Sequence, residues 1–417
     1  MKRLIVDGGR SLQGQIRVQG AKNSALPLLA ATILADSRTV LHNCPCLSDV
    51  SAALEILSYL GCKCDRDGST VTVDASSLKS FDVPDSLMHE MRSSIFFLGA
   101  IIGRIGKCRL CFPGGCEIGK RPIDLHISAL KKMGVTINED GGCIECVAEK
   151  GLCGADITLR FASVGATENI ILAAVTAKGT TVIRNAAREP EISDLADFLV
   201  KCGAKIKGAG ESTVVIEGIK KLCGCEHTVI PDRIAAATYL SCAAATRSEI
   251  TLCGADSRHL QAVLPVFEQM GARILTFDDK IHINAKRGLC SSARIETAPY
   301  PGFPTDAQAI LMAVAAGADG VCEFTENIFE NRFRHVPELV KMGADIKTDG
   351  RKAVVTGVKS LHGARVTATD LRGGAALVTA GLFAEGETVI ENIRHIDRGY
   401  ECIEKSLGEI GAKIRRE

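Results

Sequence analysis

The strongest constraint on the fold of this chain is a phrase that recurs six times. Each copy joins an apolar helix end, a glycine and the start of a strand, as in LKKMGVT and LVKCGAK. A glycine at this place is typical of the left-handed residue that ends a helix. Such a period indicates one supersecondary unit used six times. The repeat glycines lie 68 to 73 residues apart: Gly61, Gly134, Gly203, Gly271, Gly343 and Gly411.

Two kinds of helix alternate within the repeat. The helix before each glycine is amphipathic, and in the first copy the apolar residues Val50, Leu54 and Leu57 follow the helical period. The second kind, such as AQAILMAVAAG, is apolar on all sides, which is typical of a buried helix. These helices are too short to span a bilayer. With short strands such as STVVIEG between them, the pattern predicts an α/β fold with central helices and surrounding sheets.

Six units would make one very large core, so two domains of three units are favoured. The division falls near His227 to Arg233, in the segment HTVIPDR. Counting the repeats leaves the N-terminal strand over, and it must join one domain or the other.

The charge is balanced, with 50 Lys and Arg against 49 Asp and Glu. This balance argues against a partner that is bulk nucleic acid or an anionic membrane surface. The start MKRLIVDGGR has no apolar run that would make a signal peptide. We therefore expect a cytoplasmic protein whose 18 cysteines are reduced.

Two cysteine spacings resemble a four-thiolate zinc pattern, Cys108-x-x-Cys111 and Cys143-x-x-Cys146. Both pairs lie in predicted strands, where residues three apart point to opposite faces. We therefore expect small hydrophobic side chains here rather than a metal site.

Three arginines share one position, thirteen residues before a repeat glycine: Arg121, Arg258 and Arg398. Each is predicted to begin a helix, where free backbone N–H groups favour anions. The alternative is that they are solvated surface arginines.

The buried helices also begin with polar residues. In the second half these are Asp232, Asp306 and Asp370. Aspartate is a preferred N-cap, which is the structural alternative to a catalytic role. In the first half the corresponding residues are Lys22, Asn23, Arg92 and Thr167, which include two cations. If the two halves face each other, these cations would meet the aspartates, which are candidate general bases. Such an arrangement suits the transfer of an anionic group to a hydroxyl.

Cys116 lies in FPGGCEIGKRPID, behind two glycines and ahead of Lys120 and Arg121. Neighbouring cations favour a thiolate, and the glycines are typical of a hinge, so we interpret the segment as a lid with a reactive thiol. An incidental exposed cysteine is the alternative. His126 and His259 have no triad or metal partner in the sequence and are interpreted as helix-surface residues.

Seven segments of the chain resemble those of one known enzyme family. GAKNSALPLLAA, PGGCEIGKRPIDLH, SVGATEN, AAREPEI, PGFPTDAQ, ENRFRHVPEL and DLRGGAALV resemble the UDP-N-acetylglucosamine enolpyruvyl transferases, and the likeness runs over essentially the whole chain. The resemblance implies two inside-out α/β barrel domains of three units each. The first would span residues 22–229 and carry the Cys116 lid. The second would combine residues 1–21 with 230–417.

The resemblance also implies residue roles. Cys116, Asp306, Lys22 and Arg398 would be catalytic. Phosphoenolpyruvate would be bound by Lys22, Asn23, Cys116, Arg121 and Arg398. The UDP-sugar would be bound by Arg92, Arg121, Pro122, Ile123, Asp124, Leu125, Ser163, Val164, Gly165, Asp306 and Ile328. Some members carry a basic residue where this chain has Phe161, which puts a pyrophosphate contact there in doubt.

The implied reaction is addition followed by elimination. The sugar 3-hydroxyl, deprotonated by Asp306, attacks C2 of phosphoenolpyruvate while Cys116 protonates C3, and phosphate then leaves. A positioned acid helps because protonating carbon is slow. The scheme needs no metal or organic cofactor, and its partners are two small-molecule substrates. The antibiotic fosfomycin resembles phosphoenolpyruvate and would alkylate Cys116.

Other interpretations stay open. A related enolpyruvyl transferase would use shikimate 3-phosphate, and a regulatory paralogue would share the same residues. A nucleotidyl cyclase with a similar repeat would use ATP and RNA, but the chain has no P-loop. A non-enzymatic repeat scaffold would not be expected to keep Lys22, Cys116, Arg121, Asp306 and Arg398 together.

Overall fold

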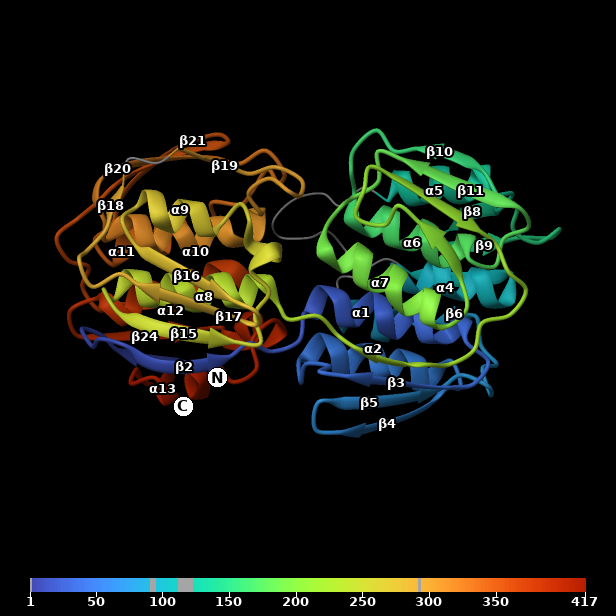
Figure 1. Ribbon diagram of the computed structural model, residues 1–417, viewed down its shortest axis with the longest axis horizontal. Helices are drawn as coiled ribbons and strands as arrows, with labels where there is room; N and C mark the ends of the chain where they lie inside the picture. Colours follow the sequence, from blue (N-terminus) through green and yellow to red (C-terminus); the bar gives the residue numbers. More distant parts are fainter. Residues whose placement is uncertain (1, 91–94, 112–122, 141, 292–293) are drawn as a thin grey trace. The chain divides into compact units, whose positions relative to one another are not determined.

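The computed structural model describes residues 2–90, 95–111, 123–140, 142–291 and 294–417. The chain divides into two compact units. Among the described residues, we name the unit formed by residues 20–111 and 123–230 the first domain, and the unit formed by residues 2–19 and 231–417 the second domain. Figure 1 labels the helices and strands of each domain.

The first domain has three sheets that share one arrangement. A short strand pairs parallel with a longer one, which pairs antiparallel with a hairpin. In sheet order the strands are β14 (Glu226–Thr228), β3 (Arg38–His42), β5 (Thr70–Asp74) and β4 (Lys63–Asp67); β6 (Asp82–Val83), β7 (Lys107–Cys111), β9 (Cys143–Val147) and β8 (Thr136–Asp140); and β10 (Asp156–Thr158), β11 (Thr180–Arg184), β13 (Thr213–Glu217) and β12 (Lys205–Lys207).

The second domain repeats this arrangement in three further sheets. They are β2 (Gln13–Arg17), β15 (Glu249–Cys253), β17 (Lys280–Asn284) and β16 (Arg273–Phe277); β18 (Cys290–Ser291), β20 (Asp319–Thr325), β22 (Lys352–Thr356) and β21 (Asp345–Asp349), with β19 (Arg294–Glu296) also paired to β20; and β23 (Arg365–Thr367), β24 (Glu387–Glu391), β1 (Leu4–Asp7) and β25 (Lys413–Arg416).

In the last sheet the third strand is the N-terminal strand β1. In the other five sheets the third strand is one arm of a hairpin with the fourth. β1 pairs antiparallel with both β24 and β25, with Leu4 opposite Ile390 and Arg416. The strand left over by repeat counting therefore completes the sixth unit, from the other end of the chain.

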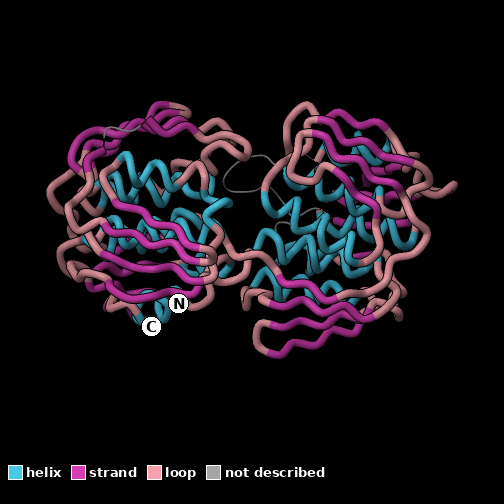
Figure 2. Tube along the Cα trace, in the orientation of Figure 1, coloured by secondary structure: helices cyan, strands magenta, loops and turns pink. Residues whose placement is uncertain are grey.

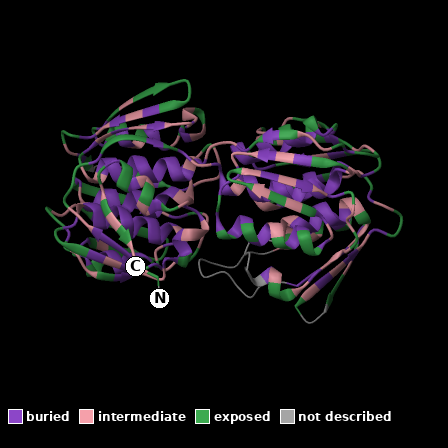
Figure 3. Cartoon of the chain, turned by 90° about the horizontal axis from the view of Figure 1, so that it is seen from below, coloured by how far each residue is buried: buried purple, intermediate pink, exposed green. Residues whose placement is uncertain are grey.

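In each domain the sheets surround the central helices (Figure 2). In the first domain the central helix α4 (Phe96–Ile105) packs on both α1 (Lys22–Ala31) and α6 (Val164–Ala174). In the second domain the three central helices all pack on one another: α8 (Arg233–Ala245), α10 (Thr305–Ala316) and α12 (Leu371–Phe383). They are buried along almost their whole length, as the sequence predicts (Figure 3). The remaining helices are α2 (Ser48–Tyr59), α3 (Asp85–Glu90), α5 (Asp124–Lys132), α7 (Pro190–Lys201), α9 (Leu264–Gln269), α11 (Val336–Lys341) and α13 (Ile403–Glu409), with 3-10 helices η1 (Thr32–Leu34), η2 (Ser257–Leu260) and η3 (Ile393–Arg398).

The six repeat glycines all adopt the left-handed conformation, with φ between 90° and 104°. A residue with a Cβ is strained there, so glycine lets the chain leave each helix and enter the next strand. The α/β class and the central helices are confirmed. The enclosure consists of separate sheets, however, and none closes into a barrel in the described part of the chain.

The cysteines correct one expectation. Cys111 and Cys143 are opposite each other on β7 and β9 and form a disulfide. Cys108 and Cys146 are opposite each other on the same two strands and are buried free thiols. The expectation of reduced cysteines is therefore wrong for Cys111 and Cys143. The antiparallel register, which the spacing alone did not reveal, placed the two sulfurs together.

Among the described residues, no helix combines the length and the apolar character needed to cross a membrane.

Candidate active site

Asp306 lies between two buried arginines in the second domain. It is the second residue of α10, and its Oδ1 accepts a hydrogen bond from Nη2 of Arg332 at 2.8 Å. Its Oδ2 accepts from Nε and Nη2 of Arg372 at 3.1 and 3.0 Å. The arginine side chains are only 3% and 2% exposed, whereas that of Asp306 is 30% exposed. The carboxylate is thus fixed and charge-compensated on its inner side and open on another.

Arg372 is fixed from its other side as well. Its Nη1 donates to the hydroxyl of Tyr400 at 3.2 Å, which lies 2.8 Å from Oγ1 of Thr238. Burial lowers the pKa of Arg372, but the charge of Asp306, together with the interactions with Tyr400 and Asp232, outweighs it, so the pKa is raised and the guanidinium stays charged. Burial also raises the pKa of the Tyr400 hydroxyl. A charged, doubly tethered guanidinium holds Asp306 in one orientation.

The three aspartates predicted from the repeat differ in what they do. Asp232 and Asp370 are N-caps, and each accepts two backbone N–H groups from the helix that it begins. Asp306 is not a cap, because the cap position of α10 is Pro304. The N-cap alternative is therefore correct for two of the three, although Oδ1 of Asp370 also lies 3.7 Å from Nη1 of Arg332. Asp306 differs because it is hydrogen-bonded to two arginine side chains without being a cap.

Ile328, predicted to bind the UDP-sugar, is tied to the start of α10 by Glu326. The Oε2 of Glu326 accepts from Oγ1 of Thr305 at 2.9 Å, and its Oε1 accepts from the amide of Ile328 at 2.8 Å. Thr305 directly precedes Asp306. The structure thus places Ile328 and Asp306 in one neighbourhood of the second domain.

Lys22 is the first residue of α1 in the first domain and is only 7% exposed. Its Nζ lies 3.3 Å from Oδ2 of Asp49, which is buried on α2. Asn23, predicted to bind phosphoenolpyruvate, follows at an intermediate degree of burial. A buried lysine needs such a partner to remain charged, so Asp49 keeps a cation at this helix start.

A buried network holds the same helix start. Ser24 Oγ donates to Oδ2 of Asp194 on α7. The Oδ1 of Asp194 lies 2.8 Å from Nε2 of His227, and Nδ1 of His227 lies 3.1 Å from Nζ of Lys201. Ser24, Asp194 and His227 are all buried. This network joins α1, α7 and the strand β14 immediately beside Lys22.

The first-domain residues predicted for the UDP-sugar gather at two helix starts. Ile123 and Asp124 begin α5, with Leu125 next, and Ser163 caps α6 by accepting from the amide of Ala166 at 3.3 Å. Val164 and Gly165 follow that cap. A Cβ built on Gly165 would lie 3.5 Å from the ring of His126 on α5, so the two starts are close together.

His126 and Arg160 connect these two helix starts, and neither role was foreseen. His126 is buried and its Nδ1 lies 2.8 Å from Nδ2 of Asn169 on α6. Burial lowers the pKa of His126 to about 4, so the ring is neutral at physiological pH. It is not the surface residue that the sequence suggested. The guanidinium of Arg160 forms an ion pair with Asp124. Arg160 therefore provides a cation next to Phe161, the position at which some family members carry a basic residue.

Arg398 and Arg258 do not begin helices as predicted. Arg398 is the last residue of η3, five residues before α13, and Arg258 lies in η2 before α9. Arg258 is 82% exposed and bound to Asp256 through Nε and Nη2. Short 3-10 helices stand where α-helix starts were predicted. A shared position in the repeat is therefore not enough to make an anion site. The predicted residues Arg92, Cys116, Arg121 and Pro122 lie outside the described residues.

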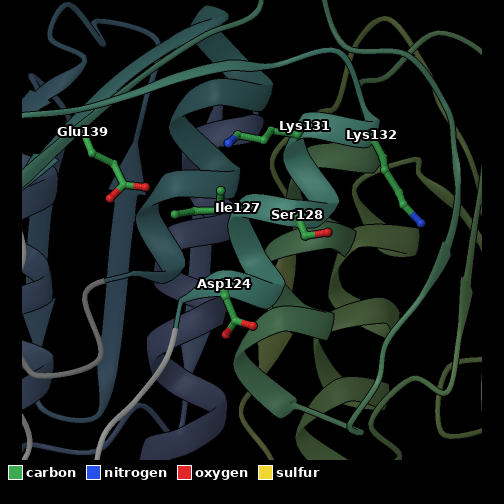
Figure 4. Close-up of a pocket in the computed structure, with 6 residues that line it drawn as sticks. All are labelled: Asp124, Ile127, Ser128, Lys131, Lys132 and Glu139. Carbon is green, nitrogen blue, oxygen red and sulfur yellow. The ribbon is translucent and has the colours of Figure 1, made fainter.

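A shallow pocket of about 550 Å³ lies on the outer side of α5. Figure 4 shows Lys131 extending toward the side on which Glu139 lies, while Lys132 points away. Its lining consists of Asp124, Ile127, Ser128, Lys131, Lys132 and Glu139. Only Asp124 belongs to the predicted set, so this pocket does not define the site.

Comparison with known proteins identifies the family of this chain. The family model described as EPSP synthase (3-phosphoshikimate 1-carboxyvinyltransferase) matches residues 6–407, and the chain belongs to this family of transferases. It is 52% identical to UDP-N-acetylglucosamine 1-carboxyvinyltransferase 2 of Caldanaerobacter subterraneus and 47% identical to the corresponding enzyme of Acinetobacter baylyi, over 100% of both chains in each case. Within the family it therefore belongs with the UDP-N-acetylglucosamine 1-carboxyvinyltransferases.

Solved structures agree on the fold. The crystal structure of the enolpyruvyl transferase NikO from Streptomyces tendae has a TM-score of 0.91 at 27% identity, covering 100% of this chain and 98% of that one. An EPSP synthase from Acinetobacter baumannii has a TM-score of 0.79 at 19% identity, with both chains fully covered. The second likeness concerns the fold alone.

Proposed function

We propose that this protein transfers the enolpyruvyl group of phosphoenolpyruvate to the 3-hydroxyl of UDP-N-acetylglucosamine and releases phosphate. The product is a precursor of peptidoglycan, so we place the protein in cell-wall synthesis in the cytoplasm. The observation that carries the proposal is Asp306. It is a carboxylate held by Arg332 and Arg372 with part of its side chain exposed, in a chain 52% identical to a named enzyme of this activity.

In this mechanism Asp306 accepts the proton of the sugar hydroxyl as that oxygen attacks C2 of phosphoenolpyruvate. Arg332 and Arg372 hold the partly exposed carboxylate in one orientation for this step. Cys116 delivers a proton to C3, and the tetrahedral adduct then loses phosphate. Lys22, Asn23, Arg121 and Arg398 bind the phosphate and carboxylate of phosphoenolpyruvate, with Asp49 keeping Lys22 charged.

The sugar nucleotide is assigned to the paired helix starts of the first domain. Asp124 and Ser163 supply polar groups there, and Arg160 supplies a positive charge near its ion-pair partner Asp124. Arg92, Pro122, Ile123, Leu125, Val164 and Gly165 complete the proposed set, together with Asp306 and Ile328 of the second domain.

The deciding experiment is phosphate release from phosphoenolpyruvate with and without UDP-N-acetylglucosamine. We expect release only when the UDP-sugar is present. Turnover with shikimate 3-phosphate and none with the UDP-sugar would instead assign the protein to the other acceptor. A folded protein that releases no phosphate with either acceptor would favour a regulatory paralogue.

Cys116 gives a second test. Serine is a far weaker acid than cysteine, so Cys116→Ser should lose most turnover. Cys116→Asp keeps an ionisable proton donor and should stay active while resisting fosfomycin, which alkylates the thiol. Full turnover by Cys116→Ser would remove Cys116 from the mechanism.

A further inference from the structure

A second pair of cysteines lies apart from the residues of the proposed reaction. Cys202 is the C-cap of α7, and Cys225 directly precedes β14. Their sulfur atoms are 3.3 Å apart, with the thiols free. A disulfide bond is about 2.0 Å long, so a small movement would close it.

The backbone holds both residues in place. The amide of Cys202 donates to the carbonyl of Phe198 at 3.0 Å, and the Cys202 carbonyl accepts from the amide of Cys223 at 3.0 Å. The carbonyl of Cys225 accepts from the amide of Val40 on β3 at 2.9 Å. The two thiols are therefore kept together by the ends of a helix and a strand, and not by a chance contact of side chains.

The two thiols differ in exposure and in charge. Cys202 is buried, whereas Cys225 is partly exposed. The hydrogen bond with Cys202 lowers the pKa of Cys225, and the charge of Lys201 lowers it further. The same hydrogen bond, together with burial, raises the pKa of Cys202. Exposure and the direction of both pKa shifts therefore favour Cys225 as the attacking sulfur and Cys202 as its buried partner, with Cys225 Sγ also 3.8 Å from the carbonyl of Phe198.

The positive charge of Lys201, close to the pair, favours a thiolate on Cys225. Lys201 stands next to Cys202 in the chain and also contacts His227 Nδ1 at 3.1 Å. The nearest further thiol along the chain is the exposed Cys223. Two other free thiols do not favour a thiolate, since burial raises the pKa of Cys62 and of Cys146 to about 12.

We propose that Cys202 and Cys225 form a thiol–disulfide exchange site that reacts with small-molecule disulfides. The Cys225 thiolate attacks one sulfur of the small disulfide, whose S–S bond breaks and releases one thiolate. Cys202 then gives up its proton and attacks the Cys225 sulfur of the mixed disulfide, which releases the second thiolate. The two released thiolates take up two protons, so two protein thiols are oxidised as one small disulfide is reduced.

The test uses the full chain and oxidised glutathione. After limited exposure, free thiols are blocked with an alkylating reagent, and unreduced peptides are identified by mass spectrometry. We expect a peptide pair linked through Cys202 and Cys225. Cys202→Ser should instead accumulate a glutathione adduct on Cys225, because the resolving thiol is missing. Cys225→Ser should leave Cys202 unmodified.

Two controls make the result decisive. Cys223→Ser should still form the linked pair, because its thiol takes no part in either step. The exposed single thiols Cys153 and Cys290 should react more slowly than Cys225 in the same sample. A link between Cys202 and Cys223, or a Cys225 no more reactive than Cys153, would overturn the proposal. Because the readout is the modification itself, it is independent of enolpyruvyl transfer.

Discussion

Both Nε and Nη2 of Arg372 donate to the same oxygen of Asp306, at 3.1 and 3.0 Å. A lysine in place of Arg372 would keep the charge but not this planar, two-point contact. Arg372→Lys should therefore misorient the carboxylate and lower kcat/KM by about 10- to 100-fold, as expected for losing hydrogen bonds to a charged group worth roughly 1.5–3 kcal/mol. Steady-state kinetics would check this on protein that remains folded.

The matched control for that change is Arg365→Lys. Arg365 also pairs with a carboxylate, Glu391, but the two side chains are 63% and 41% exposed. Exposed ion pairs contribute little, so its kinetics should be unchanged. Equal loss in both variants would mean that the orientation of Asp306 does not matter.

Arg398 is proposed to hold phosphoenolpyruvate, whereas Arg258 shares its repeat position and is bound to Asp256 at the surface. Arg398→Ala should cost at least about 1.5 kcal/mol in kcat/KM for phosphoenolpyruvate, roughly tenfold. Arg258→Ala should cost little. If titrating phosphoenolpyruvate gave the same curve for both variants, Arg398 would not be a ligand.

The buried contact between Ser24 and Asp194 should be visible as energetic coupling. Ser24→Ala and Asp194→Ala should each destabilise the protein by about 1–3 kcal/mol, since each removes one partner of a buried hydrogen bond. Because the two residues are in contact, the double variant should lose less than the two single losses added together. Urea unfolding of the four proteins measures this, and strict additivity would contradict the shared network.

Glu168 should make stability depend on pH. Burial, and then the charges of Glu191 and Glu189, raise the pKa of Glu168 well above its ordinary value. The folded state therefore binds a proton that the unfolded state has lost, and stability falls as pH rises above about 4.5. Glu168→Gln should gain stability over the parent as pH increases, by up to about 1.4 kcal/mol per pH unit. Thermal unfolding at pH 5 and pH 8 measures it. A gain that is the same at both pH values would contradict the assignment, and the exposed Glu217→Gln serves as the control.

The disulfide between Cys111 and Cys143 closes a loop with a sequence separation of 32. Constraining a loop of this length in the unfolded chain corresponds to roughly 3–4 kcal/mol in the chain-entropy account. Cys143→Ser should lower stability by up to this amount under oxidising conditions. Parent and variant should become similar once the parent is reduced, and a persistent difference would point to lost packing instead.

Much of the fold could be predicted because the repeat makes its local demands visible six times. Gly61 and its five counterparts mark positions where a left-handed residue must follow a helix, and the structure has that conformation at each of them. The apolar helices could be placed at the centre for the same reason, since no face of them is polar. Sheet pairing was harder, because the partners of a strand such as β1 lie at the opposite end of the chain.

The candidate site was less accessible to sequence reasoning. Counting from the repeat picked out Asp306, yet it could not distinguish this residue from the caps Asp232 and Asp370. That distinction depends on Arg332 and Arg372, which come from other elements and meet Asp306 only in the folded domain. Arg332 and Arg372 stand within the segments ENRFRHVPEL and DLRGGAALV, but a motif does not say what its side chain touches.

The pairing of β1 with β25 leaves the two ends of the chain side by side. The backbones of Arg3 and Glu417 exchange two hydrogen bonds, at 2.7 and 2.9 Å, as partners in an antiparallel ladder do. A short turn inserted between them would convert this ladder into an ordinary hairpin like those of the other five sheets. A circularly permuted gene, opened instead at the exposed turn between β16 and β17, should therefore encode the same domain. In that gene the strands of the sixth unit would be continuous in sequence. The same strand pairing is therefore compatible with more than one order of elements along the chain.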